Sequence, residues 1–184
     1  AVRFAARCGI LTVRPAGGTA LTMDFPTASL TEVPVPAGLA RALGAEPRSV
    51  HTTGSLEYLL VELGDEKAVR ALAPDLGALA ALDSRGVIVT APADDPGADH
   101  QFVSRFFAPG DGIPEDPVTG SAHTALAPFW AARLGRTALT GLQVSARTGL
   151  VRTALHGARV ELTGHAVTVI DGELLAVPGN THRT

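Results

Sequence analysis

One segment of this chain is apolar on almost every side of a helix. Residues 121–134 read SAHTALAPFWAARL, and Thr124, Pro128 and Arg133 are the breaks in an otherwise apolar surface. Gly135 follows as a helix-ending residue. A helix that is apolar all round is buried on every side. Since the rest of the chain is rich in strand patterns, we expect a helix enclosed by a curled sheet.

Turn residues divide the remaining sequence into short elements. We expect a hairpin of strands 2–14 and 19–25, later strands at 57–62, 85–90, 102–107, 142–146, 159–162, 166–169 and 173–177, and helices at 36–43, 66–72 and 74–82. The proline-rich residues 27–35 predict a linker. The predicted units are therefore 1–26, a domain over 36–163 around the helix, and a C-terminal strand with a tail over 164–184.

Composition narrows the possible function classes. The 184 residues are 46% hydrophobic and 18% charged, as in a packed globular protein, and the net charge of -3 argues against nucleic acid. The single cysteine, Cys8, excludes an internal disulfide framework and is expected to be a small buried side chain. No apolar run approaches the roughly 20 residues of a membrane span, and we do not expect residues 1–13 to be a signal peptide, because Arg3 and Arg7 interrupt them. We expect a cytoplasmic protein.

Cofactor and metal motifs are absent from the sequence. The six histidines have no ligand spacing, and there is no cysteine pair. Neither a Gly-x-Gly-x-x-Gly nor a Walker pattern occurs. We therefore expect no metal and no cofactor.

The segment 106–123, FFAPGDGIPEDPVTGSAH, joins a turn-rich loop to the start of the apolar helix. A helix N-terminus has free N–H groups and a partial positive charge, so it binds anions. Glu115 and Asp116 lie just upstream as proton-transfer groups. Gly120 permits close backbone approach, and Ser121 donates from its hydroxyl and its N–H. This pattern predicts acid/base chemistry on a carboxylate or carbonyl substrate.

Each of these residues also has a plainer interpretation. Asp116 alone could be a turn residue, and Glu115 could face solvent or cap the turn. His123 is expected to be a hydrogen-bonded structural histidine. A serine hydrolase acting through Ser121 and His123 is disfavoured, because residues two apart on a helix do not face each other and the Gly-x-Ser-x-Gly elbow is missing.

Two arginines are candidates for a fixed positive charge near an anionic ligand. They are Arg105 and Arg147. A solvated surface arginine is the alternative for each.

The motif resembles the signature of the phenazine-biosynthesis PhzF-like family, which is related to diaminopimelate epimerase. The resemblance rests on residues 106–109 and 112–123, with further matches at 8–13, 24–26 and 143–147. It implies an α+β fold of two similar halves. Each half is an antiparallel barrel around a central helix, and the active site lies between them.

The resemblance also implies a chemistry. The family is identified with cofactor-independent isomerisation by proton transfer on a small carboxylate substrate. Asp116 takes the acid/base position, and Thr119, Gly120 and Ser121 take the substrate-binding helix start. One small departure from the family's sequence pattern is Arg-Thr-Gly at 147–149, where the family more often has Arg-Gly-Gly.

The first half's motifs, Asn-x-Ser-Glu-Thr with the principal catalytic glutamate and Cys-Gly-His-Ala, do not occur in these 184 residues. We therefore expect this chain to be the C-terminal portion of a PhzF-like protein, with residues 1–26 as the last strands of the first domain. We expect this portion to be inactive alone. Its expected partner is the N-terminal half as a separate chain, or a second copy in a homodimer. The alternative is a non-catalytic ligand-binding or assembly module with the same fold.

Overall fold

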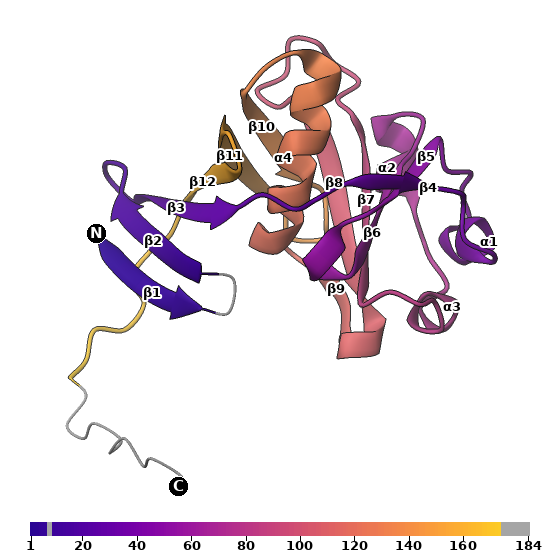
Figure 1. Cartoon of the computed structure of the whole chain (residues 1–184), viewed down its shortest axis with the longest axis horizontal. Coiled ribbons are helices and arrows are strands. Elements are labelled where there is room, and N and C mark those ends of the chain that lie inside the picture. Colours follow the sequence, from indigo (N-terminus) through magenta and orange to yellow (C-terminus); the bar gives the residue numbers. More distant parts are fainter. Residues whose placement is uncertain (7–8, 174–184) are drawn as a thin grey trace, which may run out of the picture.

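A computed structural model describes residues 1–6 and 9–173, and strands dominate it (Figure 1). The strands are β1 Val2–Ala6, β2 Gly9–Pro15, β3 Ala20–Pro26, β4 Thr31–Val33, β5 Ser49–Thr52, β6 Tyr58–Glu62, β7 Gly86–Pro92, β8 Phe102–Ala108, β9 Ile113–Asp116, β10 Ala138–Gln143, β11 Gly149–His156 and β12 Arg159–His165. The helices are α1 Leu39–Leu43, α2 Glu66–Ala71, α3 Leu76–Ala80 and α4 Gly120–Leu134, with 3₁₀ turns η1 Gly54–Leu56 and η2 Pro109–Asp111.

The strands form one mixed sheet that does not close into the expected antiparallel barrel. Its order is β1-β2-β3-β12-β11-β10-β8-β7-β6-β5-β4, with β9 paired to β8. The pairs β6–β7 and β8–β10 are parallel. The chain crosses from β6 to β7 through α2 and α3, which is how a strand returns parallel. Between β3 and β4, Ala28 donates its N–H to the Thr124 carbonyl of α4 instead of joining a ladder.

Helix α4 lies inside the curl of the sheet, between β10–β12 and β6–β8 (Figure 1). This confirms the predicted helix over 121–134. Trp130 stacks on Phe102 of β8 with ring centroids 5.8 Å apart. On another side of the helix, Ala127 packs with Val160 and Leu162 of β12. The helix is apolar nearly all round because strands contact it on more than one side.

The central strands are buried on both faces. Val87 and Val89 of β7 pack in one cluster with residues of α1, α2 and α3. Ile88, between them, packs in the cluster that contains α4. A strand covered on both faces has a continuous apolar sequence, so the predicted strand over 85–90 is confirmed.

Several predicted strand boundaries are wrong. The strand expected over 2–14 is two strands, β1 and β2, which pair with Val2 opposite Val13. Gly9 at this junction has φ 108°, a conformation that favours glycine. No strand forms over 166–169, since β12 ends at His165, and β11 has no counterpart among the predicted strands. Cys8 and most of the strand predicted over 173–177 lie outside the described residues.

The predicted domain division is not visible as a break in the sheet. β3 pairs with β12 along its length, so the N-terminal strands continue directly into the rest of the sheet. Strand β4 lies within the predicted linker and pairs with β5. The division into two domains therefore stays a prediction.

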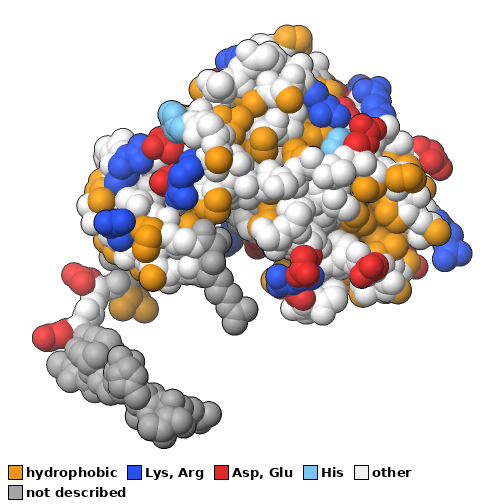
Figure 2. Space-filling view, in the orientation of Figure 1, with side chains coloured by type: hydrophobic (Ala, Val, Ile, Leu, Met, Phe, Trp, Pro, Cys, Tyr) orange, Lys and Arg blue, Asp and Glu red, His pale blue; other side chains and the backbone are white. Residues whose placement is uncertain are grey.

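The hairpin β1–β2 has an exposed apolar face. Val2 and Phe4 point to the same side, opposite Val13 and Leu11 of β2, and they are 57% and 54% exposed. Figure 2 shows hydrophobic as well as charged side chains on the lobe built by β1–β3. Nothing in the described part of the chain covers this face. Among the described helices, none has the length and apolarity needed to cross a membrane.

Candidate active site

The predicted acid lies at the junction of β9 and α4. Asp116 is the last residue of β9, half-buried and opposite Phe106 of β8. The Thr119 hydroxyl donates a hydrogen bond of 2.5 Å to Asp116 Oδ2. Thr119 is the N-cap residue of α4, but its side chain does not cap the helix. Within residues 9–173, the N–H groups of Gly120 and Ser121 have no acceptor. The helix start can therefore bind an anion beside the Asp116 carboxylate.

A buried amide from the neighbouring strand holds this turn. Gln143, the last residue of β10, has no exposed surface. Its Oε1 accepts the Thr119 N–H at 2.8 Å, and its Nε2 donates to the Asp116 carbonyl at 2.6 Å. The Ser145 hydroxyl donates to the same carbonyl at 3.0 Å. The sequence analysis included both polar residues in the matching segment 143–147 but gave neither a role, although a glutamine at the inward-facing end of a strand is a usable signal.

Glu115 forms an ion pair rather than a free proton-transfer group. Arg105 donates from Nε and from an Nη to the two carboxylate oxygens, both at 2.8 Å. Burial raises the pKa of Glu115, but the two hydrogen bonds and the charge of Arg105 outweigh this and hold the pKa below its ordinary value. Arg105 also donates to the Leu72 carbonyl at 2.7 Å. Its guanidinium is thus already occupied, which argues against the anion-binding role predicted for it.

His123 has a structural environment. It is fully buried, and its Nδ1 donates to the Thr119 carbonyl at 2.7 Å. Burial lowers its pKa to about 4, despite the opposing effect of that hydrogen bond, so the ring is neutral near pH 7. The Ser121 hydroxyl instead lies 3.4 Å from the Tyr58 hydroxyl. No bond joins Ser121 to His123, as their spacing predicts.

A cavity of about 530 Å³ opens beside the start of α4. Strands β3, β11 and β12 line most of it, and Val118 and Gly120 line the helix end. A Cβ on Gly149 would lie 2.2 Å from a Val118 methyl, so only glycine allows this close approach. Asp116 and Ser121 are not among the lining residues. The structure thus places the helix start at the cavity rim and the acid just beyond it.

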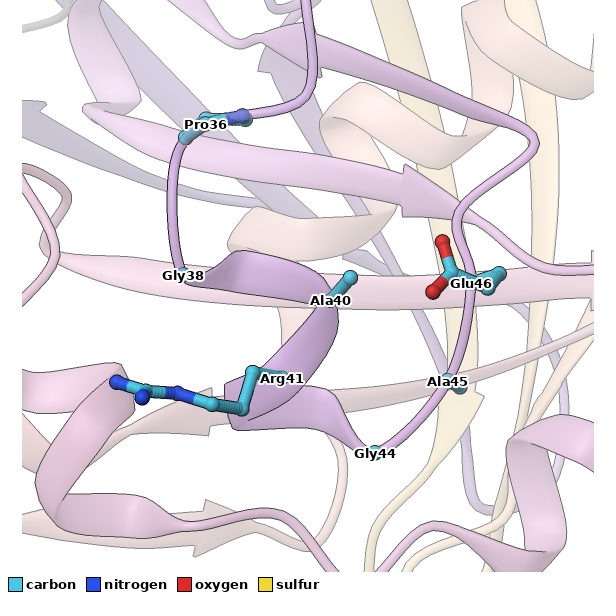
Figure 3. Close-up of a pocket in the computed structure, with 7 residues that line it drawn as sticks. All are labelled: Pro36, Gly38, Ala40, Arg41, Gly44, Ala45 and Glu46. Atoms are coloured by element: carbon cyan, nitrogen blue, oxygen red, sulfur yellow. The ribbon is translucent and has the colours of Figure 1, made fainter.

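A second hollow, of about 570 Å³, surrounds α1 at residues 36–46. Its two charged side chains, Arg41 and Glu46, lie apart on different sides of the short helix (Figure 3). It contains no residue of the 106–123 motif. We assign it no chemistry.

The remaining predicted ligand groups do not converge on this site. Arg147 is exposed and forms no ion pair with any described residue. Within residues 1–6 and 9–173, no three His, Cys, Asp or Glu side chains are grouped to hold a metal ion.

Comparison with known proteins identifies the relatives of this chain. Residues 1–172 match the PhzC-PhzF family, described as "Phenazine biosynthesis-like protein". The chain belongs to this family. It is 48% identical over 173 residues to an uncharacterized isomerase of Pseudomonas aeruginosa and 37% identical over 175 residues to one of Halalkalibacterium halodurans. The alignments cover 94% and 95% of this chain but 64% of each relative, so the chain spans less than two thirds of their length.

Solved structures of PhzC-PhzF proteins share the fold. A PhzF family protein of Enterococcus faecalis superposes with a TM-score of 0.80 at 36% identity, covering 89% of this chain and 60% of that protein. A PhzC/PhzF protein of Clostridium difficile gives 0.79 at 31% identity, with coverage of 94% and 64%. The open mixed sheet around α4 is thus similar to the corresponding part of these proteins.

Proposed function

We propose that this PhzC-PhzF chain belongs to a cofactor-independent isomerase in which Asp116 exchanges a proton with a carbon of a small carboxylate substrate. One observation carries the proposal. The Thr119 hydroxyl holds the Asp116 carboxylate next to a helix start whose Gly120 and Ser121 amides have no acceptor in the described part of the chain. A substrate carboxylate bound to those amides has its charge offset by the helix dipole, with its adjacent C–H close to Asp116.

The neighbouring residues support this arrangement. A Cβ built on Gly120 would meet no atom within 4 Å outside its own helix and chain neighbours, so there is open space beside this residue. The Ser121 hydroxyl, beside that of Tyr58, is a further donor for a substrate oxygen. The cavity at the Gly120 end has room for the body of a small molecule. The names of the relatives, which call them isomerases, agree with this reaction class.

The proposal includes a second proton-transfer group outside these 184 residues. The family resemblance assigns it to the glutamate of the Asn-x-Ser-Glu-Thr motif, which this sequence does not contain. We propose that the chain alone is inactive, because one cooperating acid/base group contributes about 10²–10⁴-fold. The N-terminal half, or a second copy, would cover the exposed Val2 and Phe4 face.

The test is Asp116→Asn in a polypeptide that also contains the Asn-x-Ser-Glu-Thr segment. Asparagine keeps an acceptor for the Thr119 hydroxyl but cannot transfer a proton. We expect the rate of solvent deuterium entry into responsive small carboxylates to fall about 10²–10⁴-fold while their affinity is retained. Asp111→Asn is the matched control, because Asp111 lies in the same loop and pairs with Arg85 at the surface.

Four results would count against this account. Unchanged turnover in Asp116→Asn removes Asp116 from catalysis. Carboxylate binding with no exchange in the intact protein favours the ligand-binding or assembly module instead. Deuterium entry with these 184 residues alone contradicts the proposed inactivity. Covalent labelling of Ser121 by a fluorophosphonate, which we do not expect, would revive the hydrolase hypothesis.

A further inference from the structure

The amide of Gln143 is fully buried and almost fully hydrogen-bonded. Its Oε1 accepts from the Thr119 N–H at 2.8 Å. Its Nε2 donates to the Asp116 carbonyl at 2.6 Å and to the Thr119 hydroxyl oxygen at 3.2 Å. A buried amide left without these partners costs free energy, so the bonds hold strand β10 against the β9–α4 turn.

These bonds also determine which way the Thr119 hydroxyl points. Because Gln143 Nε2 donates to the hydroxyl oxygen, the hydroxyl hydrogen is directed elsewhere, and Asp116 Oδ2 at 2.5 Å accepts it. A chain of donors therefore runs from Gln143 through Thr119 to the Asp116 carboxylate. Chains of hydrogen bonds strengthen one another in a buried setting.

The opposite end of the same amide fixes the start of α4. The Thr119 N–H accepted by Gln143 belongs to the residue directly before Gly120. One side chain thus bonds the Asp116 backbone carbonyl through Nε2 and, through Oε1, the N–H of the residue that precedes the helix start.

We propose that Gln143 is a positioning residue that holds the Asp116 carboxylate and the Gly120 and Ser121 amides in one fixed geometry. Gln143 acts through Thr119 and does not contact the reacting atoms. The inference rests on the proposed function. It goes beyond that function because it names a buried residue on another strand, β10, as the one that maintains the geometry of the site.

The central variant is Gln143→Met, which approximately keeps the side-chain volume and removes every hydrogen bond. The matched control is Gln101→Met. Gln101 Oε1 likewise accepts one backbone N–H, from Thr140 at 2.9 Å, and lines none of the cavity beside α4. Both are made in the 184-residue chain, and their unfolding temperatures are compared with the wild type.

Two NMR readouts separate positioning from mere stability. The first is benzoate titration followed on the Gly120 and Ser121 amides. We expect the dissociation constant to rise about tenfold in Gln143→Met, the equivalent of about 1.4 kcal/mol, and to stay within twofold in Gln101→Met. The second is the carboxyl ¹³C signal of Asp116. We expect one sharp signal in the wild type and in Gln101→Met, and several or broadened signals in Gln143→Met.

The outcomes are distinguishable. If Gln143→Met lowers the unfolding temperature but leaves the Asp116 signal single, the residue is only structural and the inference is wrong. If the wild type itself shows no benzoate shifts at Gly120 and Ser121, the anion-binding part of the proposed function fails. The Asp116 signal still decides the role of Gln143 in that case.

If Gln143→Met does not fold, a second variant can test the same proposal. Thr119→Val removes the hydroxyl that links Gln143 to Asp116 but leaves the backbone bond to Gln143 Oε1. We expect a broadened Asp116 carboxyl signal, with the residue 119 amide still protected from hydrogen exchange. Thr119→Ser restores the hydroxyl and should restore the single signal. A single sharp Asp116 signal in Thr119→Val refutes the donor chain.

Discussion

Replacing Arg105 by methionine should be among the more damaging changes next to the site. Arg105 lies on β8 and its side chain is only 12% exposed, while that of Glu115 is 23% exposed. The substitution removes two hydrogen bonds to the Glu115 carboxylate and those to the Leu72 and Val69 carbonyls. Methionine fills much of the volume of the arginine side chain, so the main effect of the substitution is the loss of these hydrogen bonds and of the ion pair.

The size of the effect follows from this partial burial. Removing one partner of a fully buried ion pair costs about 3–5 kcal/mol, and exposure lowers the value. We therefore expect Arg105→Met to lower the free energy of unfolding by about 3 kcal/mol. In a chain of this length that corresponds to a drop of about 6–12 °C in the unfolding temperature. Combining it with Glu115→Gln should cost about 1–2 kcal/mol less than the sum of the single changes, because no unpaired carboxylate remains.

Urea denaturation at several pH values measures this effect. The folded-state pKa of Glu115 lies below its ordinary 4.5, so the contribution of the pair is present above that value and is lost as the pH falls through the folded pKa. The difference between wild type and Arg105→Met should therefore shrink in acid. Arg85→Met, which breaks the exposed pair with Asp111, is the control and should change little. The reasoning would be refuted if the losses of unfolding free energy in Arg105→Met and Glu115→Gln simply added in the double variant. It would also be refuted if the stability difference between wild type and Arg105→Met did not depend on pH.

Two further predictions concern the packing around α4. Gly141→Ala should lower the free energy of unfolding by about 1–3 kcal/mol in urea denaturation, since the new Cβ would lie 2.4 Å from the Phe102 ring. Gly164→Ala, with nothing within 4 Å, should cost less. His123, with its pKa lowered to about 4, should show no ring titration by NMR between pH 5 and 8, unlike an unperturbed histidine side chain with a pKa of about 6.5. Because the unfolded state binds this proton more readily, stability should decrease as the pH falls from about 6.5 toward 4.

Local signals in the sequence were sufficient for the central helix and the motif before it. The apolar surface of 121–134 depends only on helical periodicity, and the structure confirms it as α4. The helix predicted over 66–72 is likewise confirmed as α2, and Asp65 directly before it caps the helix by accepting the Ala68 N–H at 2.8 Å. The resemblance found in residues 106–123 identified the correct family.

The sequence patterns could not predict which distant strands pair with one another. The position of β1 at the edge of the sheet and the parallel pairs β6–β7 and β8–β10 depend on which strands become neighbours. No single strand's sequence specifies its neighbours. Arg105 was a candidate for a fixed positive charge near an anionic ligand, or else a solvated surface arginine, but in the structure it pairs with Glu115 of the facing β9.

The candidate site shows the same division. The sequence by itself predicted that an acid, Asp116, lies a few residues before a helix start, because both features belong to one short segment. Only the tertiary structure showed what holds them. Gln143 comes 27 residues after Asp116, and it reaches the turn because β10 pairs in parallel with β8, which also pairs with β9. Its role arises from burial and hydrogen-bond satisfaction, which exist only once the chain is folded.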